Sequence, residues 1–211
     1  MTKRSAGRSP SKKVRDAPRS SKSAKDAHEE DLGIEINGWV IFAHPLFLEQ
    51  IENLTTAIEK ERRARARRGD TASSESSANE KTLAAIMDLA FSEIPKDPTA
   101  RQYRQGDTLG RKFTNWSRAK FGNGRFRLFF RFRTDVRVIV YAWVNDKESL
   151  RTRGSRRDAY ATFRRMLEGG DPPNSWESLV AAARSPDTRR RTYAVLSSQS
   201  ADDRPPTPLA D

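Results

Sequence analysis

The stretch Asn115–Phe132, NWSRAKFGNGRFRLFFRF, decides how the central part of this chain folds. It contains five basic residues, six aromatic residues and no acidic residue. From Arg125 onward its side chains alternate with a period of two, which is typical of a half-buried β-strand. One face of this strand would carry Arg125, Arg127, Phe129 and Arg131, and the other face Phe126, Leu128, Phe130 and Phe132.

The dipeptide Asn123-Gly124 separates this strand from an earlier one. Asn and Gly both tolerate the positive φ that tight hairpin turns require, so the two strands are predicted to form a β-hairpin. A two-residue loop places Lys120 opposite Arg127. A loop shifted back by one residue changes the pairs but leaves the cations on one face.

Basic side chains therefore stack across the predicted hairpin, where Trp116, Arg118 and Lys120 share the face of Arg127. Like charges directly across a sheet are destabilising, and no acid within the hairpin relieves them. An anionic ligand would relieve them, and phosphate suits arginine best. The alternative interpretation is a solvated polar face on an ordinary sheet.

The composition of the whole chain also favours a polyanionic partner. The 211 residues carry a formal net charge of +12. Residues 101–183 alone hold eighteen basic and eight acidic residues, a net charge of +10. Such a balance suits RNA, DNA or the ribosome. The chain has no cysteine and no apolar run near the roughly 20 residues that span a bilayer, so we expect a cytoplasmic protein without a membrane contact.

Patterning predicts one α+β domain between two tails. Residues 1–32 form a basic, Ser-rich tail and residues 184–211 a Pro-containing tail, and both are predicted to be disordered. The domain spans residues 33–183 and has a flexible break at about 68–79. Its predicted elements are an extended lead-in at 34–43, helices at 45–65 and 80–94, the hairpin, a nearly all-apolar central strand at 136–144, and short helices at 158–168 and 176–183.

The residue types present exclude several kinds of catalytic site. There are two histidines: His28 lies in the first tail, and His44 precedes Pro45, where a role at the start of the helix is the simpler interpretation. Without cysteine and with so few histidines, we expect no metal site and no cofactor. The chain also lacks a phosphate-binding glycine loop and a base for a serine nucleophile.

The chemistry that remains rests on Lys, Arg and Tyr. RNA suits such a site because its own 2′-hydroxyl is the nucleophile, so the protein must align it, stabilise charge and move protons. Lys120 is the candidate base, since nearby positive charge favours loss of its proton. Further candidate RNA contacts are Trp116, Arg125, and Lys147 and Arg153 in the segment Asn145–Arg157, which is equally consistent with a solvated loop.

Five long stretches of the chain resemble the YhaV toxins, ribonucleases of type II toxin–antitoxin systems within the RelE/ParE-type superfamily. The resemblance covers nearly all of residues 33–180. The matching stretches are NGWVIFAHPLF (Asn37–Phe47), NWSRAKFGNGRFRLFFRF (Asn115–Phe132), WVNDKESLRTRG (Trp143–Gly154), DAYATFRRML (Asp158–Leu167) and GGDPPNSWESL (Gly169–Leu179).

The resemblance implies a RelE-like fold, with two N-terminal helices on a small antiparallel sheet and short C-terminal helices. It implies metal-independent endoribonuclease activity on mRNA at translating ribosomes. It also implies a PrlF-type antitoxin that joins the toxin in repressing their own promoter on operator DNA. The catalytic residues it implies are Arg118, Lys120, Arg127, Arg151 (or Arg153) and Tyr160.

Two alternatives to an RNA-cleaving toxin stay open at this point. The first is a non-catalytic protein that binds RNA, DNA or ribosomes and inhibits by occupancy. The second, weaker alternative is a gyrase poison of the ParE kind. For the antitoxin, we expect an acidic segment that covers the basic face of the sheet and so blocks RNA.

Overall fold

The structure is a computed structural model that describes residues 34–69, 76–152 and 154–202, with side chains up to residue 195. The predicted N-terminal tail and the centre of the predicted break at 68–79 lie outside the described residues. A five-stranded mixed sheet forms the middle of the domain, in the order β1-β2-β5-β4-β3. The strands are β1 (Ile34–Ile36), β2 (Trp39–Ala43), β3 (Ser117–Phe121), β4 (Phe126–Arg133) and β5 (Val138–Val144).

The hairpin forms as predicted. Lys120 lies opposite Arg127, and Arg118 lies opposite Phe129. The turn between β3 and β4 holds Gly122, Asn123 and Gly124 in succession at positive φ. Position 122 has little room for any other residue, because an added Cβ would come within 2.6 Å of the ring of Phe126.

The sheet differs from the expected antiparallel one in its N-terminal part. The lead-in forms two strands, and β2 pairs with β5 in parallel. β5 is therefore the central strand, as its apolar run predicted, and six of its seven residues are buried. The parallel pair arises because the whole helical segment intervenes between β2 and the hairpin, which lets β5 return beside β2 in the same direction.

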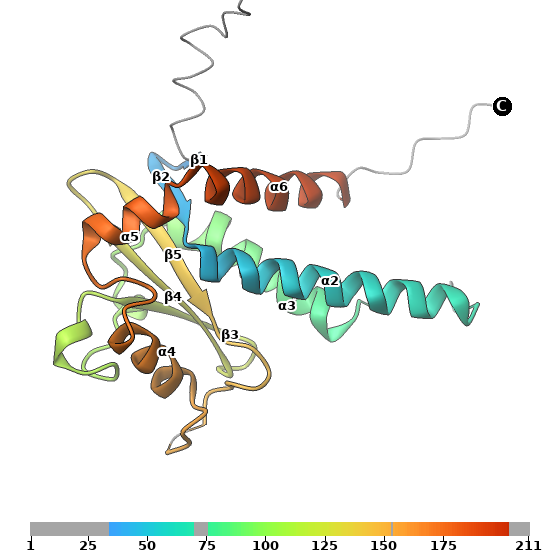
Figure 1. The fold of residues 1–211 in the computed structure, drawn as a ribbon, viewed down its shortest axis with the longest axis horizontal. Helices are drawn as coiled ribbons and strands as arrows, with labels where there is room; N and C mark the ends of the chain where they lie inside the picture. Colours follow the sequence, from blue (N-terminus) through green and yellow to red (C-terminus); the bar gives the residue numbers. More distant parts are fainter. Residues whose placement is uncertain (1–33, 70–75, 153, 203–211) are drawn as a thin grey trace, which may run out of the picture. The chain divides into compact units, whose positions relative to one another are not determined.

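Helices cover both faces of the sheet. Apolar residues of α2 and α3 build a core on one face, and those of α4 and α5 build a core on the other; we call these the α2/α3 core and the α4/α5 core. In Figure 1, α2 and α3 run away from the sheet together, whereas α4 and α5 lie on its other side. The helices are α2 (Pro45–Arg67), α3 (Ala78–Asp88), α4 (Ala159–Glu168), α5 (Trp176–Ala183) and α6 (Pro186–Asp202).

The first two helices begin at strong N-terminal signals. His44 caps α2, since its Nδ1 accepts a hydrogen bond from the backbone N–H of Leu46, which agrees with the simpler interpretation of this histidine. Ser77 and Glu80 form a reciprocal capping box at the start of α3. The predicted second helix continues past α3 as a π-helical turn and a 3₁₀ turn, which together span residues 89–96.

The prediction of a disordered C-terminal tail is wrong for residues 186–202, which form α6. Arg191 of this helix makes a bidentate ion pair with Glu52 of α2, with both N–O distances at 2.8 Å. Ser185 caps the start of α6, since its Oγ accepts a hydrogen bond from the backbone N–H of the buried Thr188 at 3.2 Å. Pro186 is the first residue of this helix, where proline is tolerated. The other prolines that suggested disorder come after the last residue of the helix.

Candidate functional site

An aromatic stack fixes the position of α4 over the strands. Pairing of β4 with β5 shifts by one residue, so that Phe129 lies opposite Trp143 while Phe130 lies opposite Tyr141. This bulge turns Trp143 toward the same face as Phe129. The rings of Phe129 and Trp143 both stack on Phe163 of α4, at centroid distances of 4.2 Å and 5.7 Å. The start of α4 is thereby held above β3 and β4.

The hydroxyl group of Tyr160, on the first turn of α4, lies between two arginines of the hairpin. Nε of Arg118 donates to it at 2.9 Å, and Nε of Arg127 donates to it at 3.3 Å. All three residues are almost fully buried. Three predicted site residues from β3, β4 and α4 thus meet at one oxygen atom.

Backbone carbonyl groups compensate much of the positive charge of these two arginines. Arg118 donates to the carbonyl of Gln102, and Arg127 donates to those of Gly124 and Phe126 at 2.8 Å and 2.7 Å. The fold itself therefore supplies acceptors for these cations, which we had expected an anionic ligand to supply. The second terminal nitrogen, Nη2, of each arginine has no hydrogen-bond partner among the described residues. Neither Nη2 atom is fully buried, so each can reach a ligand or water.

Arg151 joins the group from the segment after β5. Its guanidinium lies 5.0 Å from the centroid of the Tyr160 ring and forms an ion pair with Asp158. The carboxylate of Asp158 also accepts from the backbone N–H groups of Thr152 at 2.7 Å and Tyr160 at 3.0 Å. Asp158 therefore both caps α4 and holds Arg151 in place. This role of Asp158 was not predicted from the sequence.

Asn145 ties the same segment to the hairpin. Its side-chain oxygen accepts from the backbone N–H of Arg127 at 2.5 Å, and its amide nitrogen donates to the carbonyl of Ser149 at 3.0 Å. A further backbone bond joins the N–H of Arg151 to the carbonyl of Arg125 at 3.0 Å. A buried asparagine directly after a central strand was the available sequence signal for this role.

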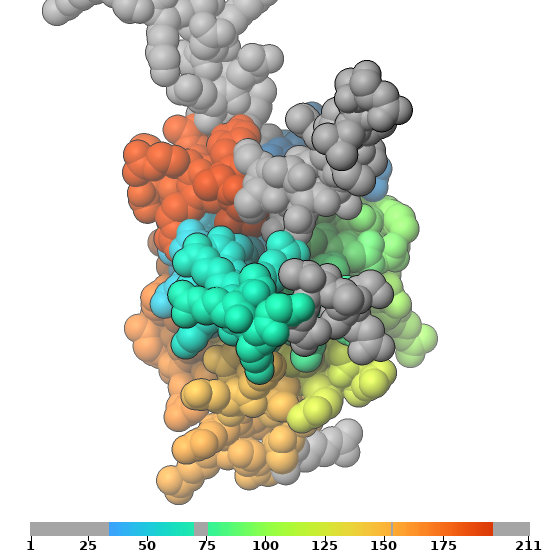
Figure 2. Space-filling view, turned by 90° about the vertical axis from the view of Figure 1, so that its right-hand side faces the viewer, coloured from blue at the N-terminus to red at the C-terminus, as the bar shows by residue number. Residues whose placement is uncertain are grey.

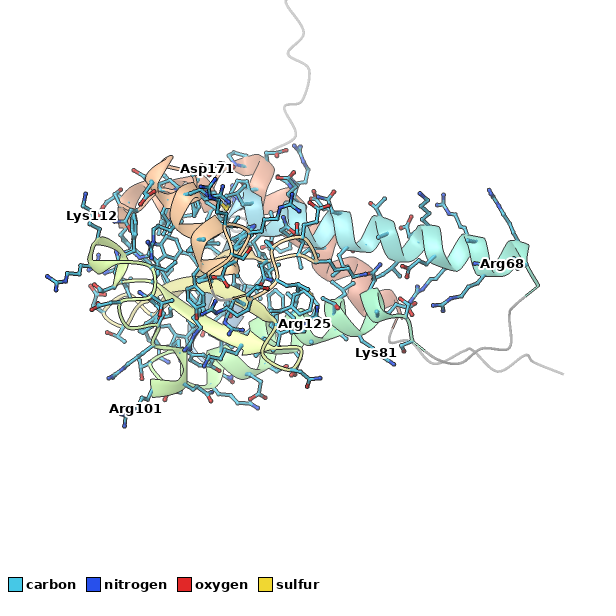
Figure 3. The ribbon with its side chains drawn as sticks, turned by 90° about the horizontal axis from the view of Figure 1, so that it is seen from below. Arg68, Lys81, Arg101, Lys112, Arg125 and Asp171 are labelled. Carbon is cyan, nitrogen blue, oxygen red and sulfur yellow. The ribbon has the colours of Figure 1, made fainter. Side chains whose placement is uncertain are left out.

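Lys120, Arg125 and Lys147 lie around the buried group as exposed cations. No side chain of these three forms a hydrogen bond or ion pair with another described residue. Lys120 is next to Arg127 across the hairpin, and Arg125 lies at its turn, at the end of the sheet in Figure 3. Arg153 lies outside the described residues.

Trp116 lies on the predicted face but is not available to RNA. Its ring is 1% exposed and packs edge-on against Phe163, and its N–H donates to Asn174 at 2.9 Å. A ring enclosed in this way cannot stack on a base, so we correct the expected RNA contact to a packing role. Arg131 is similarly occupied, since its guanidinium lies between the rings of Trp116 and Trp176.

The described part of the chain contains neither a cluster of metal-binding side chains nor a membrane-spanning helix. No three His, Asp or Glu side chains within residues 34–69, 76–152 and 154–202 gather into a possible metal site. None of the helices in those ranges combines the length and apolar character needed to cross a bilayer.

Comparisons with known proteins identify the family of this chain. Residues 41–184 match the model of a family described as a toxin with endonuclease activity, of a toxin–antitoxin system. The toxin YhaV of Escherichia coli O6:H1 is 40% identical over 152 residues, which cover 71% of this chain and 95% of that protein. The ribonuclease toxin YhaV of Escherichia coli K12 is 38% identical over 151 residues, with the same coverage. No solved structure matches the chain. The chain therefore belongs to the YhaV family of toxins with endonuclease activity.

Proposed function

We propose that this toxin is an endoribonuclease that cleaves mRNA at translating ribosomes, with the group around Tyr160 as its catalytic site. The observation that supports this proposal best is the pair of guanidinium groups that converge on the Tyr160 hydroxyl. Such a group is rich in donors and poor in carboxylates, so it suits an anionic phosphate rather than a neutral substrate.

Arg118 and Arg127 would hold the scissile phosphate through their unpartnered Nη2 atoms. Both already donate to the oxygen of Tyr160, so the hydrogen of its hydroxyl must point elsewhere. In the proposed reaction Tyr160 directs that hydrogen toward the leaving 5′-oxygen. Arg151, which Asp158 holds against the Tyr160 ring, would steady the developing charge.

Lys120 is the proposed acceptor of the proton from the 2′-hydroxyl. The 2′-oxygen attacks phosphorus, the bond from phosphorus to the 5′-oxygen breaks, and the 5′-oxygen takes the proton of the Tyr160 hydroxyl. Return of a proton to Tyr160 and loss of one from Lys120, both through solvent, restore the site. The products are a 2′,3′-cyclic phosphate and a 5′-hydroxyl, and the reaction requires no metal ion. Arg125, Lys147 and Arg153 are proposed contacts to the RNA backbone on either side of the cut.

We also propose a PrlF-type antitoxin as the partner, with which the toxin represses its promoter. The antitoxin does not lie flat on the basic strand face, because α4 and α5 already cover that face. An acidic antitoxin segment would instead bind at the rim, beside Lys120, Arg125 and Lys147, where the cations are exposed.

Induced expression tests the nuclease proposal. The wild type is compared with a Lys120→Ala/Arg127→Ala variant, and with Arg133→Ala as a matched control from the same strand. Arg133 is exposed and pairs with Asp135, outside the site. Growth arrest with new internal mRNA ends in the wild type and control, both lost in the double variant, is expected. Growth arrest without new mRNA ends would contradict the nuclease proposal and favour an inhibitor that binds its target without cleaving it.

A second variant tests the proton transfer by itself. Lys120→Arg keeps the charge but cannot give up a proton at ordinary pH. Cleavage should fall with Lys120→Arg nearly as far as with Lys120→Ala. Retained cleavage would reduce Lys120 to an electrostatic role.

A further inference from the structure

A groove outside the proposed catalytic site separates α2 and α3 from the end of β5. It has a volume of about 350 Å³ and is lined by both helices, by Phe126 at the start of β4 and by residues 144–148. Figure 2 looks at this side of the molecule, where α2 lies in the middle and the orange segment after β5 lies below it. Its size is within the range of small-molecule sites.

The groove offers polar groups that no other described residue uses. The side-chain amides of Gln50 and Asn53 line the groove from α2, and neither forms a hydrogen bond to another described residue. An amide presents one acceptor and two donors in a plane. This is the arrangement by which asparagine and glutamine pair with the edges of nucleobases.

The remaining lining is apolar and includes an aromatic ring. Leu54 and Ala57 of α2 and the partly exposed Phe126 contribute to it. Phe126 stacks on Phe121 at a centroid distance of 5.2 Å, which holds its ring in place. An apolar wall with an exposed aromatic ring is what a base needs once it has left its stack in the RNA strand.

The groove and the catalytic group lie on opposite faces of the same strand end. Phe126 lines the groove, and its neighbour Arg127 contacts Tyr160 on the other face. Arg125 is exposed at the turn, directly before Phe126, and Lys147 is exposed in the wall of the groove; neither side chain bonds to another described residue. An RNA strand that passes over the end of the hairpin would therefore meet cations on its way from one site to the other.

We propose that the groove binds one nucleobase of the RNA strand beside the cut and so determines which sequences are cleaved. This inference rests on the proposed function, which supplies the strand. The free amides and the cation next to them favour a nucleotide over an apolar protein segment, which would leave both amides unpaired when buried.

Two acidic residues in the wall of the groove are compatible with this occupant. Asp146 is occupied by the backbone N–H groups of Glu148 and Ser149, at 3.0 Å and 2.9 Å. The exposed carboxylate of Glu148 would repel a phosphate but accept a hydrogen bond from the amino group of a base. A base is therefore placed in the groove, and its phosphates lie outside, near Arg125 and Lys147.

The test is the binding of uncleavable RNA. Fluorescence anisotropy of the full chain with 2′-O-methyl oligonucleotides of A, C, G and U measures base preference without any cleavage. Ala57→Phe fills the groove, and Ala66→Phe is its matched control, on the same helix and exposed outside the groove. Asn53→Ala removes one amide from an exposed position, where it will not disturb folding.

We expect the wild type and Ala66→Phe to prefer one base by about tenfold, and Ala57→Phe and Asn53→Ala to lose that preference. Equal base preference in all four proteins would overturn the proposal. So would a loss of antitoxin binding in Ala57→Phe with RNA binding unchanged, which would make the groove a protein docking site. Absence of new internal mRNA ends after induced expression of the wild type would instead refute the proposed function, and the two failures are distinguishable because the binding assay does not depend on cleavage.

Discussion

Removal of the Tyr160 hydroxyl tests the geometry of the site through stability. In Tyr160→Phe, two buried guanidinium groups lose an acceptor, at 2.9 Å from Arg118 and 3.3 Å from Arg127. A hydrogen bond to a charged group contributes about 2 kcal/mol, and the longer bond about half of that. We therefore expect the free energy of unfolding to fall by about 3 kcal/mol.

Tyr141→Phe is the matched control for this substitution. Tyr141 is also fully buried, and its hydroxyl donates to the carbonyl of Ala90 in the α2/α3 core. This bond is neutral, so its loss should cost about 1 kcal/mol. Urea unfolding followed by tryptophan fluorescence measures both variants. With a slope of about 2 kcal/mol per molar urea, the midpoints should fall by about 1.5 M and 0.5 M.

Equal costs for the two variants would refute the proposed hydrogen bonds to Tyr160. If Tyr160→Phe cost no more than Tyr141→Phe, the Tyr160 hydroxyl would not accept from two charged donors in solution. The arrangement that supports the proposed chemistry would then be wrong, whatever the growth phenotype.

Three further predictions concern the turn, the start of α2 and α6. Gly122→Ala should lower the free energy of unfolding by about 2 kcal/mol or more, because the added Cβ would collide with the Phe126 ring. Gly124→Ala should lower it by about 1 kcal/mol, because Gly124 also has a positive φ but has open space around it. Burial lowers the pKa of His44 below 6.5, so the unfolded chain takes up a proton at this residue more readily than the folded one. The domain should therefore lose stability as the pH falls below 6.5. His44→Asn should reduce that loss, because asparagine does not titrate and can still cap the helix. A double-mutant cycle on Glu52 and Arg191 should give a favourable coupling of about 0.5 to 1 kcal/mol.

Each of these predictions has a contradicting result in urea unfolding. Equal costs for Gly122→Ala and Gly124→Ala would show that the Phe126 ring does not close over the turn. An unchanged pH dependence in His44→Asn would show that His44 titrates alike in the folded and unfolded chains. Zero coupling between Glu52 and Arg191 would show that α6 does not dock on α2 through this pair.

Local patterns predicted the hairpin and most helices well. The register of β3 and β4 followed from Asn123-Gly124 and the period-two alternation, and the bounds of α5 were predicted to the residue. The parallel pairing of β2 and β5 was not predicted, because it joins segments about 100 residues apart and no local pattern specifies it. α6 was missed because its polar sequence looks disordered until α2 supplies a partner for Arg191.

The meeting of Arg118, Arg127 and Tyr160 agrees with their predicted placement, but the contacts that hold them were not predicted. Alternation placed Arg118 and Arg127 on one face, and the family resemblance added Tyr160. The bulge in β5 and the caps formed by Asp158 and Asn145 depend on tertiary packing, so the sequence gives only weak signals of them. Trp116 was assigned the correct face but the wrong exposure, since period-two patterns do not show that helices cover both faces.

The measurement that tests the central proposal most directly is the chemistry of the RNA ends. All the proposed catalytic groups belong to this chain and not to the ribosome, so purified protein should carry out the chemistry on RNA alone. Purified wild type, Arg127→Ala and Arg133→Ala are incubated with RNA of defined sequence in the presence of EDTA, and both ends at each cut are identified. We expect the wild type and Arg133→Ala to leave 5′-hydroxyl and 2′,3′-cyclic phosphate ends, and Arg127→Ala to cleave about 100-fold more slowly or worse. Ends with 5′-phosphates, or cleavage by the wild type that stops in EDTA, would contradict the proposed mechanism.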